Sequence, residues 1–272
     1  MPLDAQTQSR TVTASLNYLL PSRDKPTRYV DAPPPGRPAW NGINDVRTVS
    51  IEDGRAHAAD FTLDRNGFEL REAPTTVRDF TNEAVVTSTY YREAERIVQT
   101  ELGATSVVVF DHTIRGPNSA REPVLRVHND YTVRSAAQRV RDLLPQDADT
   151  LLQHRFAIVN VWRPIGRPVV ASPLAVCDAA SFTDADLIPT DLVYSDRVGE
   201  TASVQFNPSH HWVYFSGMRP DEVLLIKCHD SANDGRARLS FHSAFADPTT
   251  PTDAPPRESI ELRTLVFFPP TA

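Results

Sequence analysis

The chain has 272 residues, of which 40% are hydrophobic and 23% are charged, and this composition is typical of a globular protein with a sizeable core. Its net charge of −7 argues against nucleic acid as a partner, because binding phosphate usually requires a basic face. No apolar run approaches the roughly 20 residues that span a membrane. The N-terminus lacks the basic region and apolar core of a secretory signal. We therefore expect a cytoplasmic protein that binds neither nucleic acid nor membrane.

The two cysteines, Cys177 and Cys228, are too few for a disulfide framework and have no CxxC spacing. Buried, reduced thiols are the expected state, which fits a cytoplasmic location. A catalytic thiol at Cys177 is not indicated, because no histidine-rich or glycine-turn context accompanies it.

The N-terminal third predicts few regular elements. A strand is expected at 11–20, and short strands are expected near 47–52 and 67–71. Between them, the proline-rich segment 32–38 predicts an extended surface arm.

Two segments have the pattern of helices. Residues 81–102 repeat apolar residues at spacings of three and four, with Thr81 as a candidate N-cap and Glu83 in the first turn. A second helix is expected at 133–144, where it would end before Pro145.

From residue 106 onward, most of the chain has the pattern of β-strands. Short runs of β-branched and aromatic residues alternate with proline, glycine, asparagine and aspartate. The expected strands lie at 106–112, 156–162, 169–177, 202–206, 212–215, 222–228, 238–245 and 259–268. This order predicts a mainly β fold with flanking helices, namely a double-stranded β-helix (jelly roll, cupin-like). We expect one domain over residues 1–272, with an N-terminal extension over about 1–45 and the β-helix core over about 106–272.

The sequence His128-Asn129-Asp130 is the strongest chemical signal. It follows an apolar-alternating segment, 123–128, that predicts a strand. Side chains two residues apart on a strand project to the same face, so His128 and Asp130 would point together. These are two members of the two-histidine, one-carboxylate triad that holds non-haem Fe(II) and leaves positions open for substrate and dioxygen.

The third ligand must come from later in the chain, and the residues leave several candidates: His154, His210, His211, His229 and His242. In this fold class a histidine precedes a final strand that carries an arginine, and that arginine pairs with a carboxylate of 2-oxoglutarate. Two such pairings compete.

His229 precedes Arg238 by nine residues, and His242 precedes Arg257 by fifteen. We favour the second pairing, because Arg257 opens the last predicted strand and Ser259 shares its face. Arg263 lies on the same face of that strand and is a reserve candidate for the carboxylate.

Other polar residues interrupt apolar strands and are candidates for lining a pocket. Asn160 is a candidate for cofactor binding, and Trp162, Arg163 and His210 are candidates for substrate binding. An ordinary structural role is an equally natural interpretation for each of them. No P-loop, GxGxxG, GxSxG or zinc spacing is present.

From about residue 125 to the C-terminus, the chain resembles a family of fungal and bacterial hydroxylase/desaturase-like proteins related to the gibberellin desaturase of fungi. That family also includes the protein that accompanies cephamycin 7-methoxylation and aziridine-forming amino-acid oxygenases. The matching words are VHNDYT (127–132), NVWRPIGRPV (160–169), SPLAVCDA (172–179), GETASVQFNPSHHWVYF (199–215), EVLLIKCHDS (222–231), ARLSFHSAFADP (237–248) and PRESIELRTLVFF (256–268).

The resemblance implies an oxygenase that uses Fe(II), 2-oxoglutarate as cosubstrate, and dioxygen. It carries His128, Asp130 and His242 onto the metal, and Arg257 with Ser259 onto the cosubstrate. The implied reaction activates a C–H bond of a small amino acid or a natural-product intermediate of secondary metabolism, giving hydroxylation, desaturation or oxidative cyclisation.

Two alternatives remain at this stage. The chain could be a non-catalytic accessory protein that binds another biosynthetic enzyme through its proline-rich arm. The second alternative is a metal-free or zinc cupin isomerase, although Arg257 and Ser259 would have no evident function in such an enzyme. The oligomeric state is open, and a homodimer could form through an edge strand or the N-terminal arm.

Overall fold

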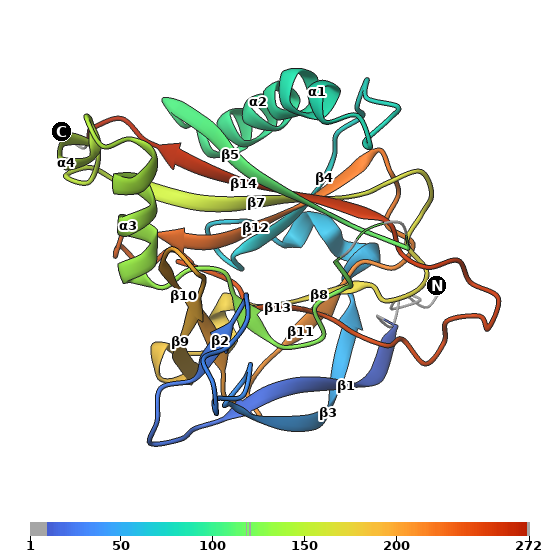
Figure 1. The fold of residues 1–272 in the computed structure, drawn as a ribbon. Coiled ribbons are helices and arrows are strands. Elements are labelled where there is room, and N and C mark those ends of the chain that lie inside the picture. Colours follow the sequence, from blue (N-terminus) through green and yellow to red (C-terminus); the bar gives the residue numbers. More distant parts are fainter. Residues whose placement is uncertain (1–9, 118, 120, 271–272) are drawn as a thin grey trace.

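Two β-sheets face each other in the computed structural model, which describes residues 10–117, 119 and 121–270 (Figure 1). The larger sheet has nine strands in the order β1-β3-β11-β8-β13-β6-β10-β9-β2. The smaller sheet has five strands in the order β4-β12-β7-β14-β5. Neighbouring strands are antiparallel, except for the parallel pairs β3·β11 and β2·β9. This architecture confirms the predicted mainly β jelly roll.

The strands of the larger sheet are β1 (Thr11–Leu20), β2 (Thr27–Tyr29), β3 (Ile43–Asp53), β6 (His128–Asn129), β8 (Leu174–Cys177), β9 (Leu187–Val193), β10 (Val198–Val204), β11 (Trp212–Tyr214) and β13 (His242–Ala244). Those of the smaller sheet are β4 (Phe68–Glu72), β5 (Ser106–Arg115), β7 (Phe156–Pro164), β12 (Glu222–Asp230) and β14 (Ser259–Phe267). The helices are α1 (Glu83–Val85), α2 (Tyr91–Leu102), α3 (Val133–Leu143) and α4 (Ala148–Leu151). A π-helical turn, Val86–Tyr90, joins α1 to α2, and 3₁₀ turns lie at Gly54–Asp60, Ala179–Ser181 and Asp184–Asp186.

The central strands of the smaller sheet are covered on both faces. Every residue of β7 and β12 is buried, and β14 is buried except at Arg263. On the outer face, Ala94 and Val98 of α2 pack against residues of β7 and β14 (Figure 1). On the inner face, side chains of β7 and β12 meet those of the larger sheet. Burial on two faces suits the many apolar residues of these strands, and polar residues such as Asn160, Lys227 and Glu261 are buried among them.

The two predicted helices are present with local changes. Helix 81–102 is divided into α1, the π-helical turn and α2, and its N-cap is Asn82 rather than Thr81, because the Asn82 side chain accepts a hydrogen bond from the Val85 amide. Helix α3 begins after Thr132, whose hydroxyl forms a capping box with Ser135.

The N-terminal segment is integrated into the larger sheet. Strand β1 pairs with β3 over ten residues, and β2 pairs with β9. The segment that we predicted as an N-terminal extension is therefore partly an edge of the sheet. Conversely, the strands expected at 169–177 and 238–245 are short, since only β8 and β13 have ladder pairing there.

Both cysteines are free and buried, as predicted. Burial raises the pKa of the Cys177 thiol to about 12. Within the described residues, no helix is long and apolar enough to cross a membrane.

Glu200 of β10 joins three parts of the chain. Its carboxylate accepts hydrogen bonds from Lys25 before β2 (2.7 Å), from Thr132 at the start of α3 (2.5 Å) and from Arg134 (2.6 Å). Burial alone would raise the pKa of Glu200, but these donors outweigh it and lower the pKa to about 2.

We expect Glu200→Gln to lower the free energy of unfolding at pH 7 by about 1–3 kcal/mol, the range for a hydrogen bond to a charged group. Because the folded pKa lies below the unfolded value, this stabilisation is present above about pH 4.5 and disappears as the pH falls to about 2. Urea unfolding at several pH values measures the difference. The exposed Glu72→Gln is the control, and a pH-independent loss in Glu200→Gln would contradict the interpretation.

Candidate metal centre and cosubstrate pocket

Three side chains converge between the sheets. His128 lies in β6, Asp130 follows it by two residues, and His242 begins β13 directly opposite His128 in the ladder. The two imidazole centroids are 4.3 Å apart, and Nε2 of His128 lies 3.6 Å from Oδ1 of Asp130. One ligand atom from each residue lies within 4.8 Å of the others. The ladder register therefore gathers three donors at the spacing that one metal ion needs.

Neighbouring groups fix the orientation of these donors. Nδ1 of His128 lies 2.7 Å from the Arg126 carbonyl, so the ring donates there and turns Nε2 toward Asp130. The other carboxylate oxygen of Asp130 accepts hydrogen bonds from Asn160 and Arg263, both at 2.9 Å. Such outer contacts set ring tautomer and carboxylate position in metal sites.

The electrostatics of the three residues suit a divalent cation. Burial lowers the pKa of His128 to about 4 and also lowers the pKa of His242, so both imidazoles are neutral at neutral pH. Burial alone would raise the pKa of Asp130, but Arg263 and the two histidines hold it well below its usual range. Two neutral nitrogens and one carboxylate are the donor set of non-haem Fe(II) sites, so the residues fit this ion.

A small cavity of about 20 Å³ adjoins the two histidines and separates them from Arg257. The guanidinium carbon of Arg257 lies 5.4 Å from the ring centroid of Trp162, and Nη1 donates to the Ser172 carbonyl at 2.8 Å. Nε of Arg257 is buried with no hydrogen-bond partner among the described residues. Burial, followed by the nearby charge of Arg115, lowers the pKa of Arg257 to about 10. This cationic group, which lines the cavity, therefore has a buried donor without an acceptor.

Arg263 does not serve as a free carboxylate binder. Its guanidinium donates to Asp130, to Asp111 (3.0 Å) and to Glu261 (2.8 Å), so each nitrogen already has a protein acceptor. These contacts leave no guanidinium nitrogen free for another carboxylate, so the prediction of Arg263 as a reserve cosubstrate residue gains no support from the structure. Asn160 likewise donates to Asp130 and does not line the cavity, so its predicted cofactor contact is replaced by a contact with a candidate ligand.

Strand alternation separates the candidates on β7. Trp162 faces the interior and lines the cavity, as predicted. Arg163 points to the opposite face, where it donates to the Tyr90 hydroxyl (2.8 Å) and to the carbonyls of Ala73 and Pro220. Its predicted substrate contact gains no support from this position, because successive side chains on a strand face opposite sides of the sheet.

The other histidines lie outside the three-residue cluster. His210 stacks on Tyr18, with Nδ1 3.2 Å from the Tyr18 hydroxyl, and does not line the cavity, contrary to its predicted substrate contact. His229, the competing ligand, packs against Phe156 instead.

Two charged residues of the cavity wall were not predicted. Glu261 lies on β14 between Ser259 and Arg263, and burial raises the pKa of its carboxyl. Arg115 ends β5 opposite Ser259. The alternation of side chains along β14 was sufficient to predict that Glu261 shares the face of Ser259. Arg115 could be found only from the register between β5 and β14.

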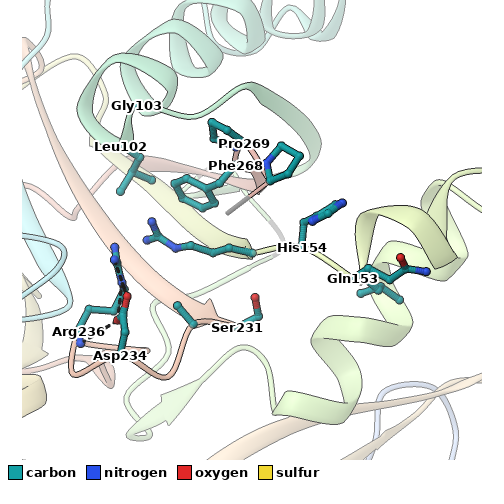
Figure 2. Close-up of a pocket in the computed structure, with 13 residues that line it drawn as sticks. Leu102, Gly103, Gln153, His154, Ser231, Asp234, Arg236, Phe268 and Pro269 are labelled. Atoms are coloured by element: carbon teal, nitrogen blue, oxygen red, sulfur yellow. Dashed lines mark hydrogen bonds and ion pairs between the residues drawn. The ribbon is translucent and has the colours of Figure 1, made fainter. Parts of the chain in front are cut away.

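A wider hollow of about 700 Å³ lies at the end of the smaller sheet (Figure 2). Leu102, His154, Ser231 and Phe268 contribute to its wall. None of the residues that line it belongs to the three-residue cluster or to the cavity beside it.

Comparisons with known proteins give the family. A family model described as "Oxidoreductase/YMDC permease-like domain" matches residues 16–267. Hydroxylase/desaturase efuI of Hormonema carpetanum is 34% identical over 297 residues, covering 98% of each chain. Fe(II)/2-oxoglutarate-dependent dioxygenase nvfI of Aspergillus novofumigatus is 35% identical, covering 88% of this chain and 90% of that protein. The chain belongs to the hydroxylase/desaturase family of Fe(II)/2-oxoglutarate-dependent dioxygenases.

The fold comparison agrees with the family. The solved structure of iron and alpha-ketoglutarate-dependent endoperoxidase NvfI matches with a TM-score of 0.88 at 31% identity, covering 95% of this chain and 98% of that chain. The predicted enzyme class and the cofactors Fe(II), 2-oxoglutarate and dioxygen are thereby confirmed. The accessory-protein alternative is not supported, because the relatives are named as enzymes.

We expect Arg263→Gln to weaken metal binding by about 10- to 100-fold, the usual effect of removing an outer partner of a ligand. Without the guanidinium, Asp130 keeps only Asn160 on its outer oxygen. Anaerobic calorimetric titration with Fe(II) measures the loss, with the exposed Arg92→Gln as control. Arg263→Lys, which keeps a positive charge, should recover part of the affinity. Unchanged affinity in Arg263→Gln would mean that Asp130 is held by the rest of its surroundings.

Proposed function

We propose that His128, Asp130 and His242 hold Fe(II), and that Arg257 with Ser259 holds the distal carboxylate of 2-oxoglutarate. The observation that carries this proposal is the convergence of the three donors beside a cavity whose far wall is a buried, incompletely bonded arginine. Ser259 is buried at the start of β14, two residues from Arg257, which supports its role beside the same carboxylate, although it is not among the residues that line the cavity.

When bound, the metal and cosubstrate supply the oxidising chemistry that uses dioxygen to activate a C–H bond of the substrate. The protein's own groups position that chemistry. Neutral imidazoles leave nitrogen lone pairs for the metal, and Asp130 is kept ionised by Arg263. Trp162 packs beside Arg257 and excludes water from its guanidinium.

The substrate is proposed to be a small amino acid or a natural-product intermediate of secondary metabolism. Relatives named hydroxylase/desaturase and endoperoxidase support hydroxylation, desaturation or oxidative cyclisation as the outcome. We further propose a single catalytic domain in a cytoplasmic location, which the two buried free thiols support. The homodimer remains a prediction that analytical ultracentrifugation of the full chain tests.

We expect His128→Ala and His242→Ala to abolish turnover, because each removes one of three ligands. The measurements are the visible band of the anaerobic iron–2-oxoglutarate chelate and succinate formation after exposure to oxygen. His154→Ala, a histidine far from the cluster, should retain both signals. A normal chelate band in either ligand variant would refute the assignment.

We expect Arg257→Met to raise the concentration of 2-oxoglutarate needed for half-maximal turnover by about 10- to 100-fold, since it removes a charge-assisted pair. The requirement for Fe(II) should change far less. Titrating succinate formation against each of the two compounds separates these effects. An equal rise in both requirements would indicate a general loss of structure, and an unchanged 2-oxoglutarate requirement would move the role to another residue.

A further inference from the structure

A pocket of about 750 Å³ lies directly outside the metal cavity. Arg115 and Val124 line both the outer pocket and the cavity beside His128 and His242. A molecule in the outer pocket is therefore separated from that cavity by these two side chains. The volume is in the range of pockets that hold drug-sized ligands.

Four arginines line this outer pocket, namely Arg28, Arg115, Arg121 and Arg126, against one acidic residue, Glu122. Within the part of the chain that the structure describes, none of the four forms an ion pair with a carboxylate. Arg115 donates a hydrogen bond to the Glu122 carbonyl (2.7 Å), and Arg121 donates one to the Thr113 hydroxyl (3.5 Å). The pocket is thus strongly cationic in a protein whose net charge is −7.

The hollow in Figure 2 offers a comparison, because the arginines that line it are paired with carboxylates of the chain itself. There Arg236 is paired with Asp234 at 2.7 Å (Figure 2), and Arg155 is paired at 2.7 Å with Asp230, which lies outside the lining of the hollow. The arginines of the outer pocket lack such partners, which indicates that an anion from outside the chain complements them.

Arg126 is the most constrained of the four. Its guanidinium carbon lies 4.4 Å from the ring centroid of Trp40, and its Nε is buried with no hydrogen-bond partner among the described residues. Burial and the charge of Arg28 lower the pKa of Arg126 to about 10. Nε1 of Trp40 and Oδ1 of Asn17 are also buried without partners at this wall. Groups of this kind are costly to bury unless a ligand or ordered water satisfies them.

Hydrogen bonds within the segment 27–41 stabilise this wall of the pocket. The Tyr29 amide donates to the Ala39 carbonyl at 2.9 Å, and the Thr27 amide donates to the Asn41 side chain at 2.6 Å, closing a hairpin over 27–41. Gly42 leaves room for Trp40, since a Cβ there would lie 2.1 Å from its ring. The proline-rich segment 32–38 is the tip of this hairpin, and its base presents Trp40 and Tyr29 to the pocket.

We propose that the outer pocket binds the substrate through a carboxylate, with Arg28 and Arg126 holding the carboxylate and Trp40 supporting a flat apolar skeleton. The oxidised carbon then faces Val124 and the metal cavity beyond it. This inference rests on the proposed function, since it names the substrate class of that same site. It also gives the N-terminal arm a role as a wall of the substrate pocket.

The test uses 2-naphthoate and its uncharged match, 2-naphthamide, as probes. Calorimetry measures their binding to the chain loaded anaerobically with Fe(II) and saturating 2-oxoglutarate, which occupies the site at Arg257. We expect the acid to bind at least about tenfold more tightly than the amide. Arg28→Gln and Arg126→Gln should each remove most of that preference, Arg126→Lys should retain part of it, and the exposed Arg78→Gln should leave it unchanged.

Equal binding of acid and amide, or no binding of the acid, would overturn the inference. So would a preference that persists in Arg28→Gln, which changes an exposed side chain and does not depend on how Arg126→Gln folds. Repeating the titration on metal-free Arg257→Met separates the two proposals. If metal-free Arg257→Met prefers the acid, while the chain without substitutions takes up no iron, only the metal assignment is refuted. Iron uptake and succinate formation without that preference would refute only the carboxylate pocket.

Discussion

The contact between Arg263 and Asp130 is the interaction on which the site depends. It joins β14 of the smaller sheet to the residue that follows β6 in the larger one, and both side chains are largely withdrawn from water. A buried ion pair of this kind is stable only when its remaining donors and acceptors are satisfied. Asn160, Asp111, Thr113 and Glu261 supply those partners. The pair therefore links the two sheets close to the cavity that His242 and Arg257 line.

Local patterns in the sequence were sufficient for much of the fold and for two of the three clustered residues. The spacing of His128 and Asp130 implied a shared direction, whereas His242 was only favoured over the competing His229, and its approach to His128 is seen in the strand ladder. The long strands β7, β12 and β14 were predictable because each contains a short run of β-branched and other apolar residues.

Long-range partners could not be predicted in the same way. Arg263 and Asp130 are 133 positions apart, and nothing local shows whether a guanidinium binds a ligand or another side chain. Strand β2 has three residues, too few to form a pattern. Arg163 is a different case, because alternation from its neighbour Trp162 already placed the two on opposite faces of β7.

The hairpin over 27–41 has a consequence for how such enzymes diversify. It belongs to the edge of the larger sheet, and in the part of the chain that the structure describes its hydrogen bonds are made within itself, to Lys25, to β9 and to Ser195, not to β6, β13 or β14. Substitutions or length changes in this hairpin therefore alter the shape and charge offered to a substrate while the oxidising centre is left intact. Selection for new substrates and selection for the reaction can act on separate segments of the chain. This separation is a physical basis for one fold occurring in relatives that are named for different reactions.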